Sequence, residues 1–233
     1  MSADTFLSMD RMYRYQRHIY DLSRKPYLLG RGRALAALAP GRDARICEIG
    51  CGTGRNLVAL ARRFPDASLF GIDASEEMLK SARRKIARRG LSGRIRLCRA
   101  LAEELEPAPS FGLAEPFDAV LFSYSLSMMP AWEHALERAL AALKPGGSLV
   151  VVDFSGAREL PAWFRSLLGR WLALFGVRPA AGLAAYFEAL AARERGRLTL
   201  ASLYRDYALL LAYRKPAGAP AAAAVVDTPP AGG

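Results

Sequence analysis

Arg45-Ile46-Cys47-Glu48-Ile49-Gly50-Cys51-Gly52-Thr53-Gly54 is the stretch that decides the fold of this 233-residue chain. A short apolar run leads into three glycines, which occupy every second position from 50 to 54. A helical pattern of apolar residues follows over positions 57–61. Because glycine adopts positive φ at little steric cost, this order predicts a strand, a tight turn and a helix. The glycines also allow a ligand to lie directly on the main chain of the turn.

Two classes of ligand use such a turn, and the spacing of the glycines separates them. The dinucleotide fingerprint G-x-G-x-x-G would need a glycine at position 55, where the chain has Arg55. The pattern E-x-G-x-G-x-G instead resembles the first motif of class I S-adenosylmethionine-dependent methyltransferases. This resemblance implies that Glu48 faces the methionine amino group of the cofactor, directly or through water. It also implies that three glycines underlie the ribose and methionine parts, namely Gly50, Gly52 and Gly54. The alternative is a turn whose glycines serve packing alone.

A second acidic residue follows at the spacing that a nucleoside cofactor needs. Leu69-Phe70-Gly71-Ile72-Asp73 is an apolar run that ends in a carboxylate, 19 positions after Gly54. An acidic residue at the end of the second strand accepts hydrogen bonds from ribose hydroxyls. Asp73 is therefore expected to bind the sugar. The alternative for Asp73 alone is the N-cap of the helix that begins just after it.

Size and composition exclude several classes of protein. The length suits one α/β domain with an ample core. No run of 18 uncharged apolar residues occurs, and the N-terminus lacks the pattern of a signal peptide, so neither a membrane span nor secretion is expected. The three cysteines, Cys47, Cys51 and Cys98, are expected to be reduced thiols in a cytoplasm. With only His18 and His134, no metal site is expected.

The net charge of +11 favours contact with nucleic acid or with an anionic membrane surface. Part of this excess is local, because nine Lys or Arg residues and no acidic residue occur between positions 80 and 99. The alternative is a solvated helix face whose charge has no partner.

Strand and helix patterns alternate along the chain, which implies parallel strands joined by right-handed crossovers. The predicted strands cover residues 45–49, 68–72, 94–98, 116–124, 148–154, 197–203 and 208–214, and the last two form an antiparallel hairpin. The predicted helices cover residues 28–38, 55–63, 75–89 and 131–143. Seven strands of this kind resemble the sheet of the class I methyltransferases. The expected fold is therefore α/β and Rossmann-like, with a mostly parallel seven-stranded sheet, an antiparallel last strand and helices on both faces.

Three regions make up the expected domain organisation. Residues 1–40 form basic, tyrosine-rich helices that act as a lid or touch a membrane, and residues 41–215 form the cofactor-binding domain. Residues 216–233 are rich in Gly, Pro and Ala without periodicity and are expected to be a disordered tail.

Residues 160–175 form an amphipathic helical insertion after the fifth strand. Apolar residues recur there at helical spacing and include Trp163, Phe164, Trp171 and Phe175, with arginines at the boundaries. Aromatic rings and arginines suit a helix in the headgroup zone of a bilayer, where docking is reversible. The alternative is that the stripe packs on the domain and that the charge is incidental.

Three parts of the chain together resemble the bacterial betaine-lipid N-methyltransferases. They are residues 10–31, the stretch Phe122-Ser123-Tyr124-Ser125-Leu126-Ser127-Met128-Met129-Pro130 and Leu203-Tyr204-Arg205-Asp206-Tyr207. Those enzymes trimethylate the amino group of diacylglyceryl-homoserine. The resemblance implies a peripheral enzyme on the inner face of the plasma membrane, with an amino lipid as substrate. A related family methylates phosphatidylethanolamine, which is the rival substrate. RNA or a small molecule is a remote alternative.

The lipid reaction implies candidate substrate residues. Each transfer brings positive charge to the amine, and aromatic faces stabilise such cations. The candidates are Tyr15, Tyr20, Tyr27, Tyr124 and Tyr204, of which Tyr20 and Tyr124 are favoured as catalytic residues. A core or surface role is the alternative for each. The homoserine carboxylate implies an arginine, for which Arg24 and Arg205 are candidates.

The remaining cofactor contacts follow from the methyltransferase resemblance. Arg31 is a candidate for holding the cofactor's carboxylate, and Tyr20 is expected to lie beside the sulfonium. Further expected contacts are Asn56, Ala74, Leu101, Ala102 and Ser123. Leu101 departs from the family pattern, because many members have an aspartate there that receives the adenine amino group. Adenine recognition would then depend on backbone groups around Leu101 and Ala102, with Glu103 beside them.

Overall fold

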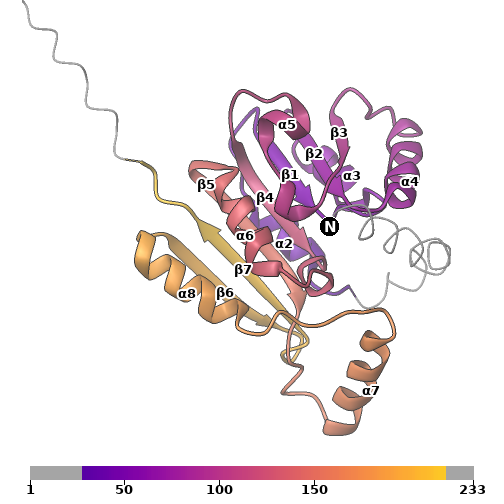
Figure 1. The fold of residues 1–233 in the computed structure, drawn as a ribbon, viewed down its shortest axis with the longest axis vertical. Helices are drawn as coiled ribbons and strands as arrows, with labels where there is room; N and C mark the ends of the chain where they lie inside the picture. The colour runs from indigo at the N-terminus through magenta and orange to yellow at the C-terminus, as the bar shows by residue number, and fades with distance from the viewer. Residues whose placement is uncertain (1–27, 219–233) are drawn as a thin grey trace, which may run out of the picture.

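The computed structural model describes residues 28–218 of the chain as a seven-stranded sheet with helices on both faces (Figure 1). The strand order is β3-β2-β1-β4-β5-β7-β6. Because only β7 runs antiparallel to its neighbours, the mostly parallel Rossmann-like sheet expected from the alternating pattern is confirmed. The strands are β1 (Arg45–Ile49), β2 (Ser68–Asp73), β3 (Ile95–Arg99), β4 (Phe117–Ser123), β5 (Leu143–Phe154), β6 (Arg197–Leu203) and β7 (Ala208–Arg214).

Helices cover the two faces of the sheet in separate groups. The core on one face joins α2 (Arg31–Ala37), α3 (Arg55–Arg63) and α4 (Glu76–Ala87) to the strands. The core on the other face joins α5 (Pro107–Phe111), α6 (Trp132–Ala141) and α8 (Leu183–Glu194). Two short 3₁₀ turns, η1 (Ala102–Glu104) and η2 (Leu126–Met128), follow β3 and β4. α7 (Ala162–Ala173) extends away from the sheet in Figure 1.

The central strands are buried because helices cover both of their faces. In β1, Ile46 belongs to one core, while Cys47 and Ile49 belong to the other. All three side chains are inaccessible to solvent. Such burial explains why these strands are continuous in apolar residues rather than alternating with polar ones.

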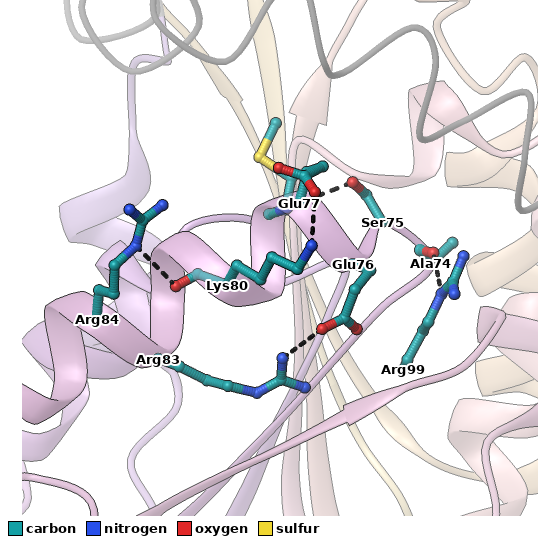
Figure 2. Close-up of polar contacts among 9 residues, drawn as sticks. Ala74, Ser75, Glu76, Glu77, Lys80, Arg83, Arg84 and Arg99 are labelled. Atoms are coloured by element: carbon teal, nitrogen blue, oxygen red, sulfur yellow. Dashed lines mark hydrogen bonds and ion pairs between the residues drawn. The ribbon is translucent and has the colours of Figure 1, made fainter.

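Local signals place the ends of α4. The hydroxyl Oγ of Ser75 accepts a hydrogen bond from the Met78 amide at 3.3 Å and so caps the helix. Glu76 and Glu77 lie in the first turn, where carboxylates stabilise the helix dipole. Figure 2 shows that these carboxylates pair with cations of the same helix, Lys80 with Glu77 and Arg83 with Glu76.

The structure corrects several predicted element boundaries. The predicted helix over 28–38 is shorter, since α2 runs from Arg31 to Ala37. The helix predicted over 131–143 ends at Ala141, because Leu143 already pairs with Phe117 of β4. Residues 144–147, which separate the predicted helix from the predicted fifth strand, belong to β5 and form an irregularity between the pairs Phe117–Leu143 and Ala119–Ser148. Helices α5 and α8 were not predicted.

Some expectations concern residues outside the described range. Most of the N-terminal basic, tyrosine-rich region expected over residues 1–40 is among them, since its first 27 residues are not described, and so is most of the predicted tail. Residues 216–218 are described, and the Pro216 carbonyl accepts a hydrogen bond from the Gly146 amide at 3.0 Å. No helix between residues 28 and 218 is long and apolar enough to cross a bilayer.

Candidate functional site

A cavity of about 570 Å³ lies at the carboxyl ends of β1, β2 and β4. It therefore occupies the crevice at the switch point of strand order, between β1 and β4, where open α/β sheets bind ligands. Its volume is in the range of small-molecule sites. The predicted site residues that line it are Arg31, Glu48, Gly50, Gly52, Asn56, Asp73, Ala74, Leu101, Ala102, Ser123 and Tyr124.

Glu48 is the buried carboxyl group of this cavity, with 2 % of its surface exposed. Its Oε1 accepts a hydrogen bond from Nδ2 of Asn56 at 2.7 Å. Its Oε2 is buried without a hydrogen-bond partner among residues 28–218. Burial raises the pKa of Glu48 to about 8, although the Asn56 hydrogen bond and the charge of Arg31 oppose the rise. An unpaired carboxyl oxygen of this kind fits a ligand that brings a hydrogen-bond donor or a positive charge.

Asp73 ties the end of β2 to the glycine turn. Its Oδ2 accepts a hydrogen bond from the Gly52 amide at 2.7 Å, and its Oδ1 accepts one from the Ser75 amide at 2.9 Å. The adjacent Ala74 carbonyl accepts a hydrogen bond from Arg99 Nε at 3.2 Å, as Figure 2 shows. Asp73 thus fixes the floor of the cavity while its carboxylate lines it.

The three glycines of the turn have different surroundings, although all have positive φ. A Cβ on Gly50 would lie 2.5 Å from Cβ of Ser125, so this position needs glycine for packing. A Cβ on Gly52 would meet no described atom within 4 Å, so this glycine leaves open space beside the cavity. Gly54 does not line the cavity, since it packs on Ala82 of α4 at the start of α3. Close packing therefore explains why positions 50 and 54 are glycines. At Gly52 the space beside the main chain is free for a ligand.

The carboxyl end of β4 forms the opposite wall with three hydroxyl residues. Tyr124 has a positive φ of 56°, and its phenol donates a hydrogen bond to the Leu29 carbonyl at 2.5 Å. Burial raises the pKa of the Tyr124 phenol above its usual value. Ser125 Oγ donates to the Ile49 carbonyl at 2.8 Å, whereas Ser123 Oγ is buried without a partner within the described part of the chain.

The structure separates the predicted substrate residues. Tyr124 lines the cavity, but Tyr204 and Arg205 lie in the turn between β6 and β7 and do not. Tyr204 is 47 % exposed, and the guanidinium of Arg33 lies 5.7 Å from its ring centroid. The other candidates, Tyr15, Tyr20, Arg24 and Tyr27, lie outside the described residues.

Further lining residues were not predicted. They include Thr53, Arg55, Met78, Glu104 and His134. Thr53 and Arg55 flank Gly54, so the motif itself pointed to them, whereas Met78 and His134 reach the cavity from helices. Met78 is buried on α4 and His134 is exposed on α6, and helical periodicity did not identify either as a lining residue, because the direction from a helix to a ligand depends on tertiary packing.

The cavity fits the S-adenosylmethionine expected from the glycine pattern. The unpaired Oε2 of Glu48 suits the ammonium group, and Asp73 at the end of β2 suits the ribose. Gly52 leaves room for a ligand on the main chain. When bound, this cofactor supplies an electrophilic methyl group. No group of three or more His, Cys, Asp or Glu residues that would hold a metal ion occurs between residues 28 and 218.

Helix α7 divides its apolar residues between two sides. Leu172 is buried in the core, and Leu168, Trp171 and Phe175 pack partly against it. The other side exposes Trp163, Leu167 and Leu174 by 69 %, 61 % and 77 %. The sequence left packing and surface contact as alternatives for residues 160–175, and the structure assigns packing to one side of the helix.

Both ends of the α7 segment are attached at the carboxyl edge of the sheet. At its start, the Arg158 amide and Nε donate to Oδ2 of the buried Asp206 at 3.1 and 2.9 Å. At its end, the Arg178 amide donates to the Ser127 carbonyl at 2.7 Å, in the loop after β4. The α7 segment is therefore attached at the same edge of the sheet as the cavity.

Most of the basic segment 80–99 has local partners. Arg94 donates to the carbonyls of Ala61, Phe64 and Ala67, and Lys85 donates to Thr53 Oγ1 at 2.8 Å. Together with the ion pairs inside α4, these contacts give most of these basic side chains a partner within the protein.

Comparisons with known proteins agree with this geometry. The model of a family described as "Methyltransferase domain" matches residues 46–147. The trans-aconitate 2-methyltransferase of Deinococcus radiodurans is 31 % identical over 191 residues, which cover 77 % of this chain and 68 % of that enzyme. The phosphatidylethanolamine N-methyltransferase of Cereibacter sphaeroides is 33 % identical over 135 residues, which cover 58 % of this chain and 63 % of that enzyme.

Other similarities cover less of the relatives or show the fold alone. The chain spans about half the length of several ubiquinone/menaquinone biosynthesis C-methyltransferases that it matches, for example 48 % of the one from Syntrophotalea carbinolica. The solved structure of the plantazolicin methyltransferase BpumL, in complex with SAH and a substrate analogue, has a TM-score of 0.64 at 17 % identity. That similarity covers 92 % of this chain and 94 % of the BpumL chain.

Proposed function

Because this chain belongs to the class I S-adenosylmethionine-dependent methyltransferases, we propose that it methylates the amino headgroup of a membrane lipid. The methyl donor is S-adenosylmethionine, as the glycine motif and Asp73 predicted. The proposed acceptor is diacylglyceryl-homoserine, and the proposed product is its trimethylated betaine lipid. The proposed location is the inner face of the plasma membrane, with the protein bound peripherally.

The exposed side of α7 carries this proposal. Trp163, Leu167 and Leu174 would enter the headgroup zone, and the exposed Arg165 and Arg170 would meet anionic lipid. Each such arginine contributes about 1 kcal/mol near an anionic leaflet. Since α7 is attached at the edge where the cavity lies, docking would bring lipid headgroups to the site.

The chemistry of an amino lipid suits the residues of the cavity. An α-amino group has an unperturbed pKa of about 7.7–8.0, so a useful fraction is neutral near pH 7 and has a free lone pair. Proximity and alignment then contribute much of the rate, of the order of 7–11 kcal/mol in favourable cases. Tyr124 lines the cavity, and its aromatic ring would stabilise the charge that develops on nitrogen.

Phosphatidylethanolamine is the second candidate, because an enzyme named for it is among the relatives of this chain. Purified protein would be incubated with labelled S-adenosylmethionine and with vesicles that contain either lipid. Label in the homoserine lipid supports the proposal, and label only in phosphatidylethanolamine replaces the acceptor. Label in neither lipid would overturn lipid methylation.

A separate experiment tests membrane docking. Replacing both Trp163 and Leu167 by Ser is expected to reduce co-sedimentation with anionic vesicles. Arg165→Glu should reduce it as well, and Arg193→Glu on α8 is the matched control, since it makes the same charge change on another exposed helix. Equal losses for the two arginine variants would indicate general charge attraction, and unchanged binding of the double variant would reject α7 as the docking helix.

A further inference from the structure

We propose that the Ser123 hydroxyl orients the acceptor amine by accepting a hydrogen bond from one of its N–H groups during the first two methyl transfers. This inference rests on the proposed function, since it requires an amine acceptor. The family resemblance implied that Ser123 contacts the cofactor. This inference assigns Ser123 to the acceptor instead.

The hydroxyls at the carboxyl end of β4 differ in one respect. Tyr124 donates to the Leu29 carbonyl and Ser125 donates to the Ile49 carbonyl, so both have partners in the protein. Ser123 Oγ is buried and has no partner among the residues that the structure describes, although the residue lines the cavity. Because a buried polar group without a hydrogen-bond partner is destabilising, a ligand group is the expected partner.

The position of Ser123 places it beside the glycine turn. Phe122 pairs with Ile49 of β1, so Ser123 lies one residue further, where β1 enters the glycine turn at Gly50. Within residues 28–218, Glu48 on β1 has the other unpaired buried oxygen of this cavity. Two unsatisfied groups of different chemistry thus line one cavity at the ends of neighbouring strands.

The carboxylate of Glu48 and the hydroxyl of Ser123 suit different amines. A carboxylate stabilises an ammonium ion, which suits the amino group of the cofactor but would keep an acceptor protonated and without a lone pair. A neutral hydroxyl accepts a hydrogen bond from an N–H group and stabilises the ammonium form less than a carboxylate does. Ser123 therefore suits a neutral amine whose lone pair points at the methyl group.

The number of N–H hydrogens on the acceptor determines which methyl transfers Ser123 can affect. The nitrogen lone pair forms the new N–C bond while the C–S bond of the sulfonium breaks and leaves a neutral thioether. The methylated ammonium then loses a proton to water before the next transfer. A primary amine has two N–H hydrogens and a monomethyl amine has one, whereas a dimethyl amine has none. The Ser123 hydrogen bond can therefore form in the first and second steps and not in the third.

Single-turnover rates on the three acceptors test this assignment. The full-length protein would be loaded with S-adenosylmethionine and mixed with vesicles containing the unmethylated, monomethyl or dimethyl form of whichever lipid the wild type methylates. Ser123→Ala is expected to slow the first two steps by about 2- to 10-fold, the value of one hydrogen bond, and to leave the third step unchanged. Ser125→Ala is the matched control: its hydroxyl also lines the site but binds the Ile49 carbonyl, so any loss should be equal in all three steps.

Three outcomes would overturn the assignment. Equal slowing of all three steps by Ser123→Ala, or no slowing of any, excludes an N–H acceptor. Weaker binding of S-adenosylhomocysteine by the same factor as the rate loss assigns Ser123 to the cofactor. Failure of the wild type to methylate any amine refutes the proposed function, and this inference with it, whereas the first two outcomes leave the proposed function intact.

Discussion

Glu48 and Asn56 share a single hydrogen bond of 2.7 Å, from Nδ2 to Oε1, which leaves the other carboxyl oxygen of Glu48 buried and unpaired among residues 28–218. The pair links the end of β1 to the first turn of α3 across the glycine turn. Because burial raises the pKa of Glu48 to about 8, this carboxyl group holds a proton at pH 7 when the cavity has no cationic ligand.

Cofactor binding is therefore expected to release a proton. At pH 7 the amino group of S-adenosylhomocysteine is mostly protonated, and its charge favours the ionised form of Glu48. Titration calorimetry in buffers of different ionisation enthalpy should show release of close to one proton, and affinity should rise from pH 6 towards pH 8. Glu48→Gln should abolish the release, whereas Glu188→Gln, at an exposed position on α8, should preserve it. Binding by the wild type without proton release would contradict the pairing.

The same raised pKa predicts how stability without ligand depends on pH. Between pH 4.5 and about 8 the folded protein keeps the Glu48 proton, while the unfolded chain has lost it. The folded state thus binds more protons in this window, so the contribution of this group to stability falls as the pH rises. The melting temperature of Glu48→Gln relative to wild type should increase from pH 5 to pH 8. A constant difference across this window would argue against the shifted pKa.

Alanine substitutions should separate two glycines of the turn. In Gly50→Ala the new Cβ would meet Ser125 at 2.5 Å, and the positive φ adds strain, so the protein should lose both stability and activity. In Gly52→Ala the space is open, so the loss of stability should be smaller, of the order of 1 kcal/mol from positive φ. Its main effect should be weaker binding of S-adenosylhomocysteine. Thermal melting and calorimetry of both variants measure this contrast, which would be absent if all glycines served packing alone.

Asp73→Ala is expected to weaken cofactor binding at least roughly tenfold, because hydrogen bonds to a charged group are worth about 1.5–3 kcal/mol each. The change also removes the bonds to the Gly52 and Ser75 amides, so the turn should loosen. Asp66→Ala is the control, since Asp66 is exposed before β2 and does not line the cavity. Unchanged affinity for S-adenosylhomocysteine in Asp73→Ala would exclude the sugar-binding role.

Local patterns were sufficient for much of the fold. The predicted ranges for β1, α3, β6 and β7 coincide with the structure, because apolar runs bounded by glycine and helical spacing act over a few residues. Helix α8 was missed although Leu183, Phe187 and Leu190 recur at helical spacing and are buried. Many alanines surround these residues, so the helical pattern of large apolar residues is weak in the sequence. The buried face of α8 is evident only from its packing against β6 and β7.

The sequence by itself determined the strand–turn–helix motif, the Rossmann-like order of elements and the methyl donor, since these depend on residue order and spacing. Only the tertiary structure decided that Gly54 packs on α4, that Tyr204 and Arg205 do not line the cavity and that α7 buries one side. It also decided that Glu48 and Ser123 have oxygens without a partner in the described part of the chain, because burial and hydrogen bonding depend on which elements meet. The spacing of residues along the chain predicts which helix or strand forms and which of its faces is apolar. The contacts of a side chain with residues of other elements depend on how those elements pack.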